Sequence, residues 1–164
     1  MVLLRDFQQN DLPKLVDILN DKSVNQFLST KIPSPYTPED ASWWITEGSK
    51  GDLIKAIEFD SQLVGCIGVT RGEFEYQRTG ELGYWLDAEY WRKGITSQAI
   101  EMLLEQVFSK TDIVRIFATV FSSNLASMQL LINSGFKHEA ILEKSIFKNG
   151  KFYDSHIFAK VRVH

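Results

Sequence analysis

The residues with the clearest chemical potential form a basic, glycine-containing turn, RKGITS, at positions 92–97. The turn follows an apolar run that ends at Leu86 and precedes apolar residues at helical spacing, so it is expected to join a strand to a helix. The first N–H groups of a helix have no intrahelical partner, and the helix dipole places partial positive charge beside them. The turn is therefore predicted to bind an anion such as phosphate.

The residue types in the turn support this prediction, but its spacing is not specific. Gly94 allows the backbone to approach a ligand closely, and Arg92 and Lys93 add positive charge outside the turn. The segment lacks the spacing of a nucleotide P-loop and the three glycines of a dinucleotide fingerprint. On spacing alone, an ordinary strand–helix connection with two solvated cations explains the turn equally well.

Composition limits the class of protein. The chain has 164 residues, 44% of them hydrophobic, which is typical of one globular domain. The formal net charge of −3 shows no general basic excess. Any anion site must therefore be local, and direct binding of nucleic acid is not expected.

Cysteine and histidine usage argues against disulfide or metal chemistry. The only cysteine, Cys66, lies in the apolar run 63–69 and is expected to be a buried, inert thiol in a reducing compartment. The three histidines, His138, His156 and His164, fall in no metal-ligand spacing, so no metal is predicted. Because the sequence shows no signal-peptide pattern and no membrane-spanning run, we expect a cytoplasmic protein with no membrane partner. We expect it to be a monomer or a homodimer.

The first half of the chain predicts one strand, two helices and a hairpin. Asn10 or Asp11 is expected to cap the first helix, and Thr37 the second, which has proline at its first position and ends near Gly48. The segment 21–36 between these helices is expected to be irregular because prolines interrupt it. The predicted strands are residues 2–4, 53–59 and 63–69, the last two forming a hairpin, and residues 71–78 are a loop or a further hairpin arm.

The second half predicts a β-α-β unit followed by another helix and a closing hairpin. Its strands are expected at residues 81–86, 113–121, 140–147 and 152–163, and its helices at about 96–109 and after a cap at Asn124 or Ser123. The two strands of the β-α-β unit should run parallel, whereas Asn149-Gly150 predicts a tight antiparallel hairpin. The predicted fold class is therefore α/β (α+β mixed), a mixed sheet with helices on both faces.

Five segments together resemble the GNAT N-acetyltransferase superfamily, and within it the Rim-type branch that acetylates protein N-termini. They are LLRDFQQNDL, IPSPYTPEDASWWI, ELGYWLDAEYWRKGITSQAI, NLASMQLLINSGFKHEAIL and NGKFYDSHIF, in the order expected of that branch. The resemblance covers nearly the whole length and implies a single acetyltransferase domain, residues 1–164. It also implies a mostly antiparallel sheet of six to seven strands, whose parallel pair splays apart beyond Leu86 to bind acetyl-CoA.

Two motifs depart from the pattern of the family. Its pyrophosphate loop reads Q/R-x-x-G-x-G/A, and the matching positions here are Trp91, Gly94 and Thr96. Many members carry a tyrosine general acid in the second cofactor motif, where this sequence has Leu131. The resemblance therefore moves the role of acid, where one is used, to Ser127.

The resemblance assigns candidate residues to each step of the reaction. Glu81 is the candidate base, and a backbone N–H near Trp85 or Leu86 the candidate donor to the oxyanion. Cofactor contacts are predicted at Trp85, Leu86, Asp87, Arg92, Lys93, Gly94, Ile95, Thr96, Ser97, Asn124 and Ser127. Acceptor contacts are predicted at Tyr36, Trp43, Trp44 and Tyr84, although aromatic residues at helical spacing are more often core.

Plain structural roles explain several of these residues equally simply. Glu81 is also readable as a solvated carboxylate at a strand end, and Asn124 as a helix cap. The leading function is transfer of acetyl from acetyl-CoA to the N-terminal amine of a protein or peptide, of ribosomal-protein type. The alternatives are acetylation of a small amine, such as a polyamine, amino acid or antibiotic, and a non-catalytic acyl-CoA-binding module.

Overall fold

The computed structural model describes residues 1–51 and 53–163, and the chain divides into two compact units. Unit 1 comprises Met1–Gly68 and Tyr84–Leu103, and unit 2 comprises Val69–Gly83 and the chain from Leu104 onward. The helices are α1 (Leu12–Leu19), α2 (Lys22–Asn25), α3 (Pro38–Trp43), α4 (Ile95–Lys110) and α5 (Leu125–Asn133). No helix in these described ranges is both long and apolar enough to cross a bilayer.

The sheet has seven strands in the order β1-β2-β3-β4-β5-β7-β6. Its strands are β1 (Val2–Arg5), β2 (Ile54–Phe59), β3 (Gln62–Arg71), β4 (Thr79–Leu86), β5 (Arg115–Phe121), β6 (Lys137–Lys148) and β7 (Lys151–Val161). Strands β4 and β5 run parallel, whereas β1–β2, β2–β3, β5–β7 and β6–β7 are antiparallel. The predicted mixed, mostly antiparallel sheet is confirmed, and the placement of helices on both faces stays a prediction.

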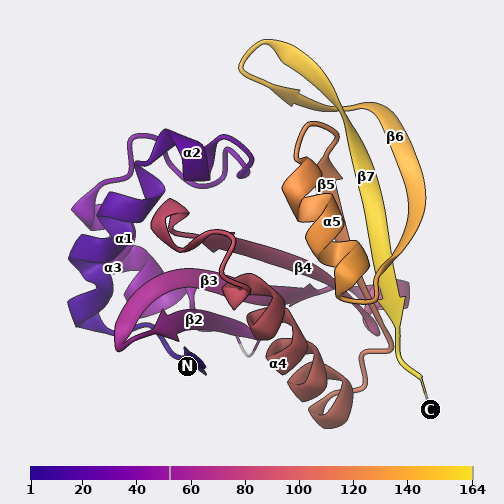
Figure 1. Ribbon diagram of the computed structural model, residues 1–164, viewed down its shortest axis with the longest axis horizontal. Coiled ribbons are helices and arrows are strands. Elements are labelled where there is room, and N and C mark those ends of the chain that lie inside the picture. The colour runs from indigo at the N-terminus through magenta and orange to yellow at the C-terminus, as the bar shows by residue number, and fades with distance from the viewer. Residues whose placement is uncertain (52, 164) are drawn as a thin grey trace. The chain divides into compact units, whose positions relative to one another are not determined.

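In unit 1 the helices α1 and α3 pack with the hairpin β2–β3 around a continuous apolar core (Figure 1). The predicted cap of α3 is confirmed, because Thr37 Oγ1 accepts from the Asp40 N–H at 3.2 Å and the Asp40 carboxylate accepts from the Thr37 N–H at 2.9 Å. Cys66 lies in this core, where burial raises the pKa of its thiol to about 12. The thiol is therefore protonated and inert at neutral pH, as expected.

The structure corrects two local expectations in unit 1. The segment predicted to be irregular contains the short helix α2, whose cap Asp21 accepts from the Ser23 N–H at 2.9 Å. After Trp43 the chain continues as a π-helix over Trp44–Gly48. Gly48 fits this turn because a Cβ there would lie 2.5 Å from the Trp43 ring, which explains why the helical segment ends at a glycine.

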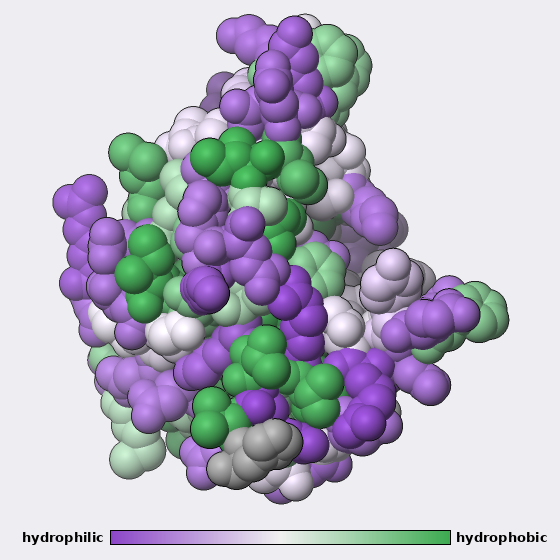
Figure 2. Space-filling view, turned by 90° about the vertical axis from the view of Figure 1, so that its right-hand side faces the viewer, coloured by the Kyte–Doolittle hydropathy of each residue, from purple (hydrophilic) through white to green (hydrophobic). Residues whose placement is uncertain are grey.

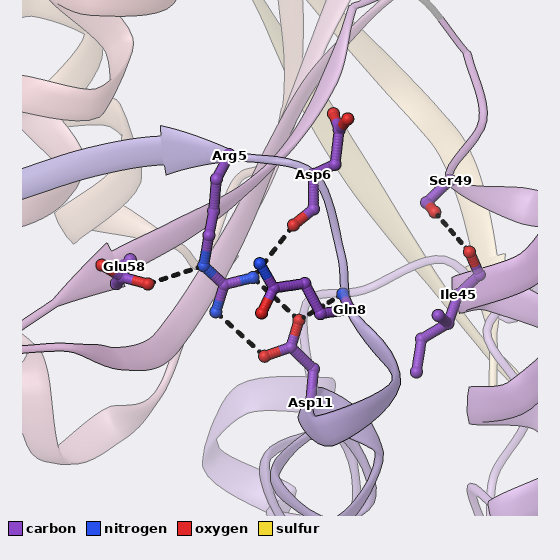
Figure 3. Close-up of polar contacts among 7 residues, drawn as sticks. All are labelled: Arg5, Asp6, Gln8, Asp11, Ile45, Ser49 and Glu58. Carbon is purple, nitrogen blue, oxygen red and sulfur yellow. Dashed lines mark hydrogen bonds and ion pairs between the residues drawn. The ribbon is translucent and has the colours of Figure 1, made fainter.

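Asp11 does not cap α1 with its side chain, contrary to the prediction. Its carboxylate accepts from the Gln8 N–H at 2.8 Å and from both Nη atoms of Arg5 at 2.9 Å. Arg5 Nε also donates to Glu58 at 2.7 Å, so one guanidinium ties β1 to β2 and to the turn before α1 (Figure 3). The bond to Asp11 raises the pKa of Arg5 above its ordinary value, which keeps the charge that this network requires.

We predict that Asp11→Ala lowers the free energy of unfolding by about 2–4 kcal/mol, because it leaves a partly buried guanidinium without its bidentate partner. Denaturant titration measures the loss. Asp6→Ala is the matched control: Asp6 also forms an ion pair, with Lys55 at 2.9 Å, but its side chain is 77% exposed. Its removal is expected to change stability little, and equal losses in the two variants would contradict this account.

In unit 2 the long β6–β7 hairpin extends past α5 (Figure 1). The predicted tight turn is confirmed: Asn149 and Gly150 have φ of 52° and 76°, and Lys148 pairs with Lys151. Strand β6 begins earlier than predicted, because its pairing with β7 continues back to Lys137, opposite Ala159. Exposed apolar side chains on the hairpin, such as Ile141 and Phe147, are interspersed with charged ones, and hydrophobic and hydrophilic surface alternate on this side of the molecule (Figure 2).

Candidate active site

The predicted anion turn, residues 92–97, leads directly into helix α4. Arg92 and Gly94 both have left-handed backbones, with φ of 64° and 76°. The Gln98 N–H donates to the Gly94 carbonyl at 3.2 Å, which makes Gly94 the residue that precedes the first turn of α4. The N–H groups of Ile95, Thr96 and Ser97 therefore belong to that first turn, where a helix offers donors to an anion.

A buried carboxylate, Asp87, positions the segment that leads into this turn. Asp87 Oδ1 accepts from the Glu89 N–H at 3.1 Å and so caps the short 3-10 helix Ala88–Tyr90. Asp87 Oδ2 pairs with Lys14 Nζ of α1 at 3.1 Å, and that hydrogen bond raises the pKa of Lys14. The path of the chain from β4 to the anion turn is thus tied to the first helix.

Two aromatic residues hold the same segment in place. The Trp91 indole N–H donates to the Leu86 carbonyl at 2.9 Å, which closes the loop back onto the end of β4. The Tyr90 ring packs edge-on against the Phe59 ring, with centroids 6.0 Å apart. Lys93 Nζ lies over the Tyr90 ring, 5.3 Å from its centroid. Lys93 is thereby kept beside the turn as a cation.

The backbone of β4 alternates between its two edges. The Asp87 N–H donates to the Val64 carbonyl of β3 at 2.7 Å, and the Thr79 carbonyl accepts from the Gly72 N–H at 2.9 Å. The Arg78 carbonyl instead accepts from the Val114 N–H at 2.9 Å, on the side of β5. Because successive residues of a strand point their peptide groups to opposite edges, odd-numbered residues of β4 face β3 and even-numbered residues face away from it.

This alternation refines the predicted backbone contacts with a cofactor. Asp87 was a predicted contact, but its N–H is already used by β3, and the Trp85 peptide points to the same edge. Leu86, also predicted, has its N–H on the opposite edge. The parallel ladder of β4 with β5 covers Thr79 to Glu81, so the pairing ends at Glu81 rather than at Leu86 as expected.

In unit 2, Glu81 stands on an open face of β4. Its Cα pairs with Phe117 of β5, and its side chain is exposed. Gly83, two residues on and therefore on the same face, has nothing within 4 Å of the position that a Cβ would occupy. The carboxylate thus has free space beside it, which suits a base that must reach a substrate and equally a solvated strand residue.

The start of α5 places Asn124 and Ser127 as the sequence predicted. Asn124 Oδ1 accepts from the Ser127 N–H at 3.2 Å, so Asn124 is the cap and Ser123 is not. Ser127 is half-buried, one turn before the fully buried Leu131 on the same helix face. Leu131 therefore belongs to the core of unit 2, and the prediction that Ser127 replaces a tyrosine acid stays a prediction.

The aromatic residues predicted to contact an acceptor lie in different environments within unit 1. Tyr36 is buried in the core, and burial raises the pKa of its hydroxyl to about 12. Trp44 packs on the same core with its ring edge-on to Phe7 at 5.7 Å. Trp43 is 56% exposed, whereas Trp44 and Tyr84 are both half-buried, so Trp43 presents the most surface to a ligand.

Sequence reasoning missed the partner that fixes the turn. Lys14 is far from Asp87 in the chain, and no local pattern pairs them. Among residues 1–51 and 53–163 no group of three or more metal-ligating side chains converges, and His164 lies outside the described residues.

Comparison with known proteins places the chain in a family. The family model described as "Acetyltransferase (GNAT) domain" matches residues 1–137. The uncharacterized N-acetyltransferase YoaA of Bacillus subtilis is 35% identical over 101 residues, 62% of this chain and 56% of that protein. The ribosomal-protein-serine acetyltransferase of Escherichia coli is 29% identical over 102 residues, again 62% of this chain and 56% of that protein. Each of these two alignments thus spans little more than half of the relative's length.

Solved structures extend the likeness over the whole chain. The microcin C7 self-immunity acetyltransferase MccE, in complex with acetyl-CoA and AMP, superposes with a TM-score of 0.84 at 25% identity. The match covers 98% of this chain and 92% of that one. The seven-stranded mixed sheet described above is therefore the fold of these enzymes.

Proposed function

Because the chain belongs to the GNAT acetyltransferase family, we propose that it transfers the acetyl group of acetyl-CoA to a primary amine, the N-terminal amine of a protein or peptide. The observation that carries the proposal is the anion turn, residues 92–97. Two of its residues, Arg92 and Gly94, have left-handed backbones, and the turn leads directly into the 16-residue helix α4. The turn would hold the phosphates of coenzyme A on the N–H groups of Ile95, Thr96 and Ser97. Arg92 and Lys93 would add charge from outside.

The pantetheine arm of acetyl-CoA would add to the outer edge of β4 as a strand does. By the alternation of that strand, the Leu86 N–H points to this edge. The Leu86 N–H would then be the donor to the oxyanion that forms when the amine attacks the thioester carbonyl. Loss of one such donor typically costs about 2.7–4 kcal/mol of transition-state stabilisation.

The transfer itself forms a C–N bond and breaks the C–S bond. The attacking ammonium loses one proton before attack and the amine loses a second as the tetrahedral intermediate collapses. Glu81, directly or through water, accepts the first of these protons, and the second passes to solvent. Ser127 donates a hydrogen bond to the departing thiolate, which leaves as coenzyme A after taking up a proton from solvent.

A protein acceptor is favoured by the Escherichia coli relative, whose name states a ribosomal-protein substrate. A small-molecule acceptor is the second candidate, because MccE was solved in complex with the small molecule AMP as well as acetyl-CoA. The exposed Trp43 and half-buried Tyr84 offer aromatic surface that either acceptor class would use.

The proposal is tested by measuring the release of coenzyme A from acetyl-CoA with a thiol reagent. The candidate acceptors are peptides with free N-termini, N-terminally blocked peptides and small amines. Turnover with free but not blocked peptides supports a peptide α-amine acceptor. Turnover only with small amines supports the second candidate. Binding of acetyl-CoA without turnover on any amine would leave a binding module and overturn the proposed activity.

We predict that Gly94→Ala weakens binding of coenzyme A about tenfold, because alanine disfavours the left-handed backbone that aims the N–H groups. Gly150→Ala is a matched control: both glycines have φ of 76°, and at both an added Cβ would meet nothing within 4 Å, so the strain is alike. Calorimetric titration should show the loss in the first variant only. Equal affinities in both would remove the turn from the cofactor site.

Glu81→Gln is predicted to lower turnover at least tenfold near pH 6 and progressively less toward pH 9. The neutral fraction of an α-amine with a pKa of about 7.7–8.0 falls tenfold for each pH unit below that value, so a base matters most in acid. A pH series of kcat/KM measures the effect. A variant whose profile parallels that of the wild type would show that Glu81 is only a solvated carboxylate.

Ser127→Ala is predicted to lower kcat about tenfold, the effect of one hydrogen bond to a charged leaving group, while α5 keeps its cap. The cap survives this change because Asn124 binds the backbone N–H of residue 127, which alanine keeps. Asn124→Ala is the contrasting variant and should cost about 0.5–2 kcal/mol of stability. Full turnover in Ser127→Ala would exclude a role for its hydroxyl in the reaction.

A further inference from the structure

Two histidines meet on the β6–β7 hairpin, and neither is assigned a part in acetyl transfer. His156 Nδ1 of β7 lies 3.0 Å from His138 Nε2 of β6. The ring planes are only 25° apart, with centroids separated by 5.0 Å. Since the two nitrogens are much closer than the ring centres, the rings meet edge to edge and direct their nitrogens at each other.

From this arrangement we propose that His138 and His156 form a binding site for one first-row divalent transition-metal ion, such as Ni²⁺ or Cu²⁺. In the metal-free protein one of the two facing nitrogens donates a hydrogen bond to the other. When the ion accepts a lone pair from each nitrogen, the proton of that N–H moves, by exchange with water, to the other nitrogen of the same ring. Imidazole is a preferred ligand of these ions.

The spacing of the nitrogens suits a chelate. Two nitrogens bound to one ion at about 2.0–2.1 Å lie about 2.9 Å apart when they are at right angles and about 3.4 Å apart at the tetrahedral angle. The observed 3.0 Å is near the right-angle value. It therefore favours ions that accept octahedral or square-planar nitrogen coordination, with water in the remaining positions.

The hairpin holds both imidazoles before any ion arrives. His138 is opposite Phe158 and His156 is opposite Ile141, so paired residues of the ladder fix each Cα. A bulge between His138 and Ala140 shifts the register there. The His138 ring also contacts the buried Phe158 ring, with centroids 4.9 Å apart. A preorganised ligand pair loses little conformational entropy on binding.

The surroundings leave the pair accessible to an ion. His138 is exposed and His156 half-buried, so an ion can reach the facing nitrogens. The neighbouring Glu139 is held by Arg115, with Oε2 2.9 Å from Nη1, and that hydrogen bond lowers the pKa of Glu139. Its carboxylate is thus already neutralised by Arg115 and is not counted as a third ligand.

Sequence spacing did not reveal this pair. The two histidines are 18 residues apart and are supplied by different strands, and neither has a second ligand at a helical or loop spacing. Only the register of the hairpin brings them together. The proposal therefore rests on the fold and not on a sequence motif.

Titration calorimetry of the full, untagged chain with Ni²⁺ near pH 7.5 tests the proposal. We expect one saturable site per chain. His138→Gln and His156→Gln should each weaken it at least tenfold, and His164→Gln, the matched control, should change the affinity less than twofold. Thermal melts give a second measurement: Ni²⁺ should raise the Tm of the wild type but not that of His138→Gln.

Two results would overturn the proposal: no saturable one-to-one binding in the wild type, or unchanged affinity in His138→Gln. His138 is exposed, so its replacement is not expected to unfold the protein and decides the question even if His156→Gln folds poorly. The test needs no acetyl-CoA, so its outcome is independent of the proposed acetyl transfer.

Discussion

The two-sided hydrogen bonding of β4 is the constraint on which the candidate site depends. One edge of the strand is committed to β3 and its flanking loop, through the Asp87 N–H bound to Val64 and the Thr79 carbonyl bound to Gly72. A buried strand cannot leave peptide groups unpaired without a cost of about 1–3 kcal/mol each. On the other edge, the parallel ladder with β5 covers only Thr79 to Glu81. The Leu86 carbonyl already meets the Trp91 indole there, which leaves its N–H as the group that a ligand carbonyl would meet.

The segment that follows β4, from Asp87 to Tyr90, determines where the anion turn lies. Asp87 is nearly buried, yet each carboxylate oxygen has a partner, the Glu89 N–H and Lys14. Burying a carboxylate is tolerable only with such compensation. Because Lys14 belongs to α1, whose start is held by the Arg5 network (Figure 3), the stability of the first helix and the geometry of the anion turn are coupled. Polar residues with no proposed contact to the cofactor thus support its proposed site.

Local chemistry explains which parts of this arrangement were predictable. The cap at Thr37, the cap at Asn124, the Asn149-Gly150 turn and the apolar stripe of α4 follow from interactions within a few residues, so the sequence displays them directly. Asp11 was a predicted cap of α1, but its carboxylate instead accepts hydrogen bonds from Arg5 and from the Gln8 N–H. Whether Arg5 can reach Asp11 depends on where β1 ends. The pairs Lys14–Asp87 and His138–His156 depend on tertiary register, which one sequence cannot reveal. The direction of each β4 peptide group likewise requires the strand's neighbours to be known.

The open environment of Glu81 is consistent with the chemistry proposed for it. A base whose substrate is an α-amine has little to overcome, because that amine is partly neutral at physiological pH. Deep burial of the base is therefore unnecessary, and an exposed glutamate beside the bare Gly83 leaves room for an acceptor of variable shape. The more demanding task is to hold the thioester and stabilise its oxyanion, and the proposal gives that task to backbone N–H groups of β4 and α4, which no side-chain substitution removes. The proposal therefore separates an acceptor side built on an exposed side chain from a cofactor side built on the backbone.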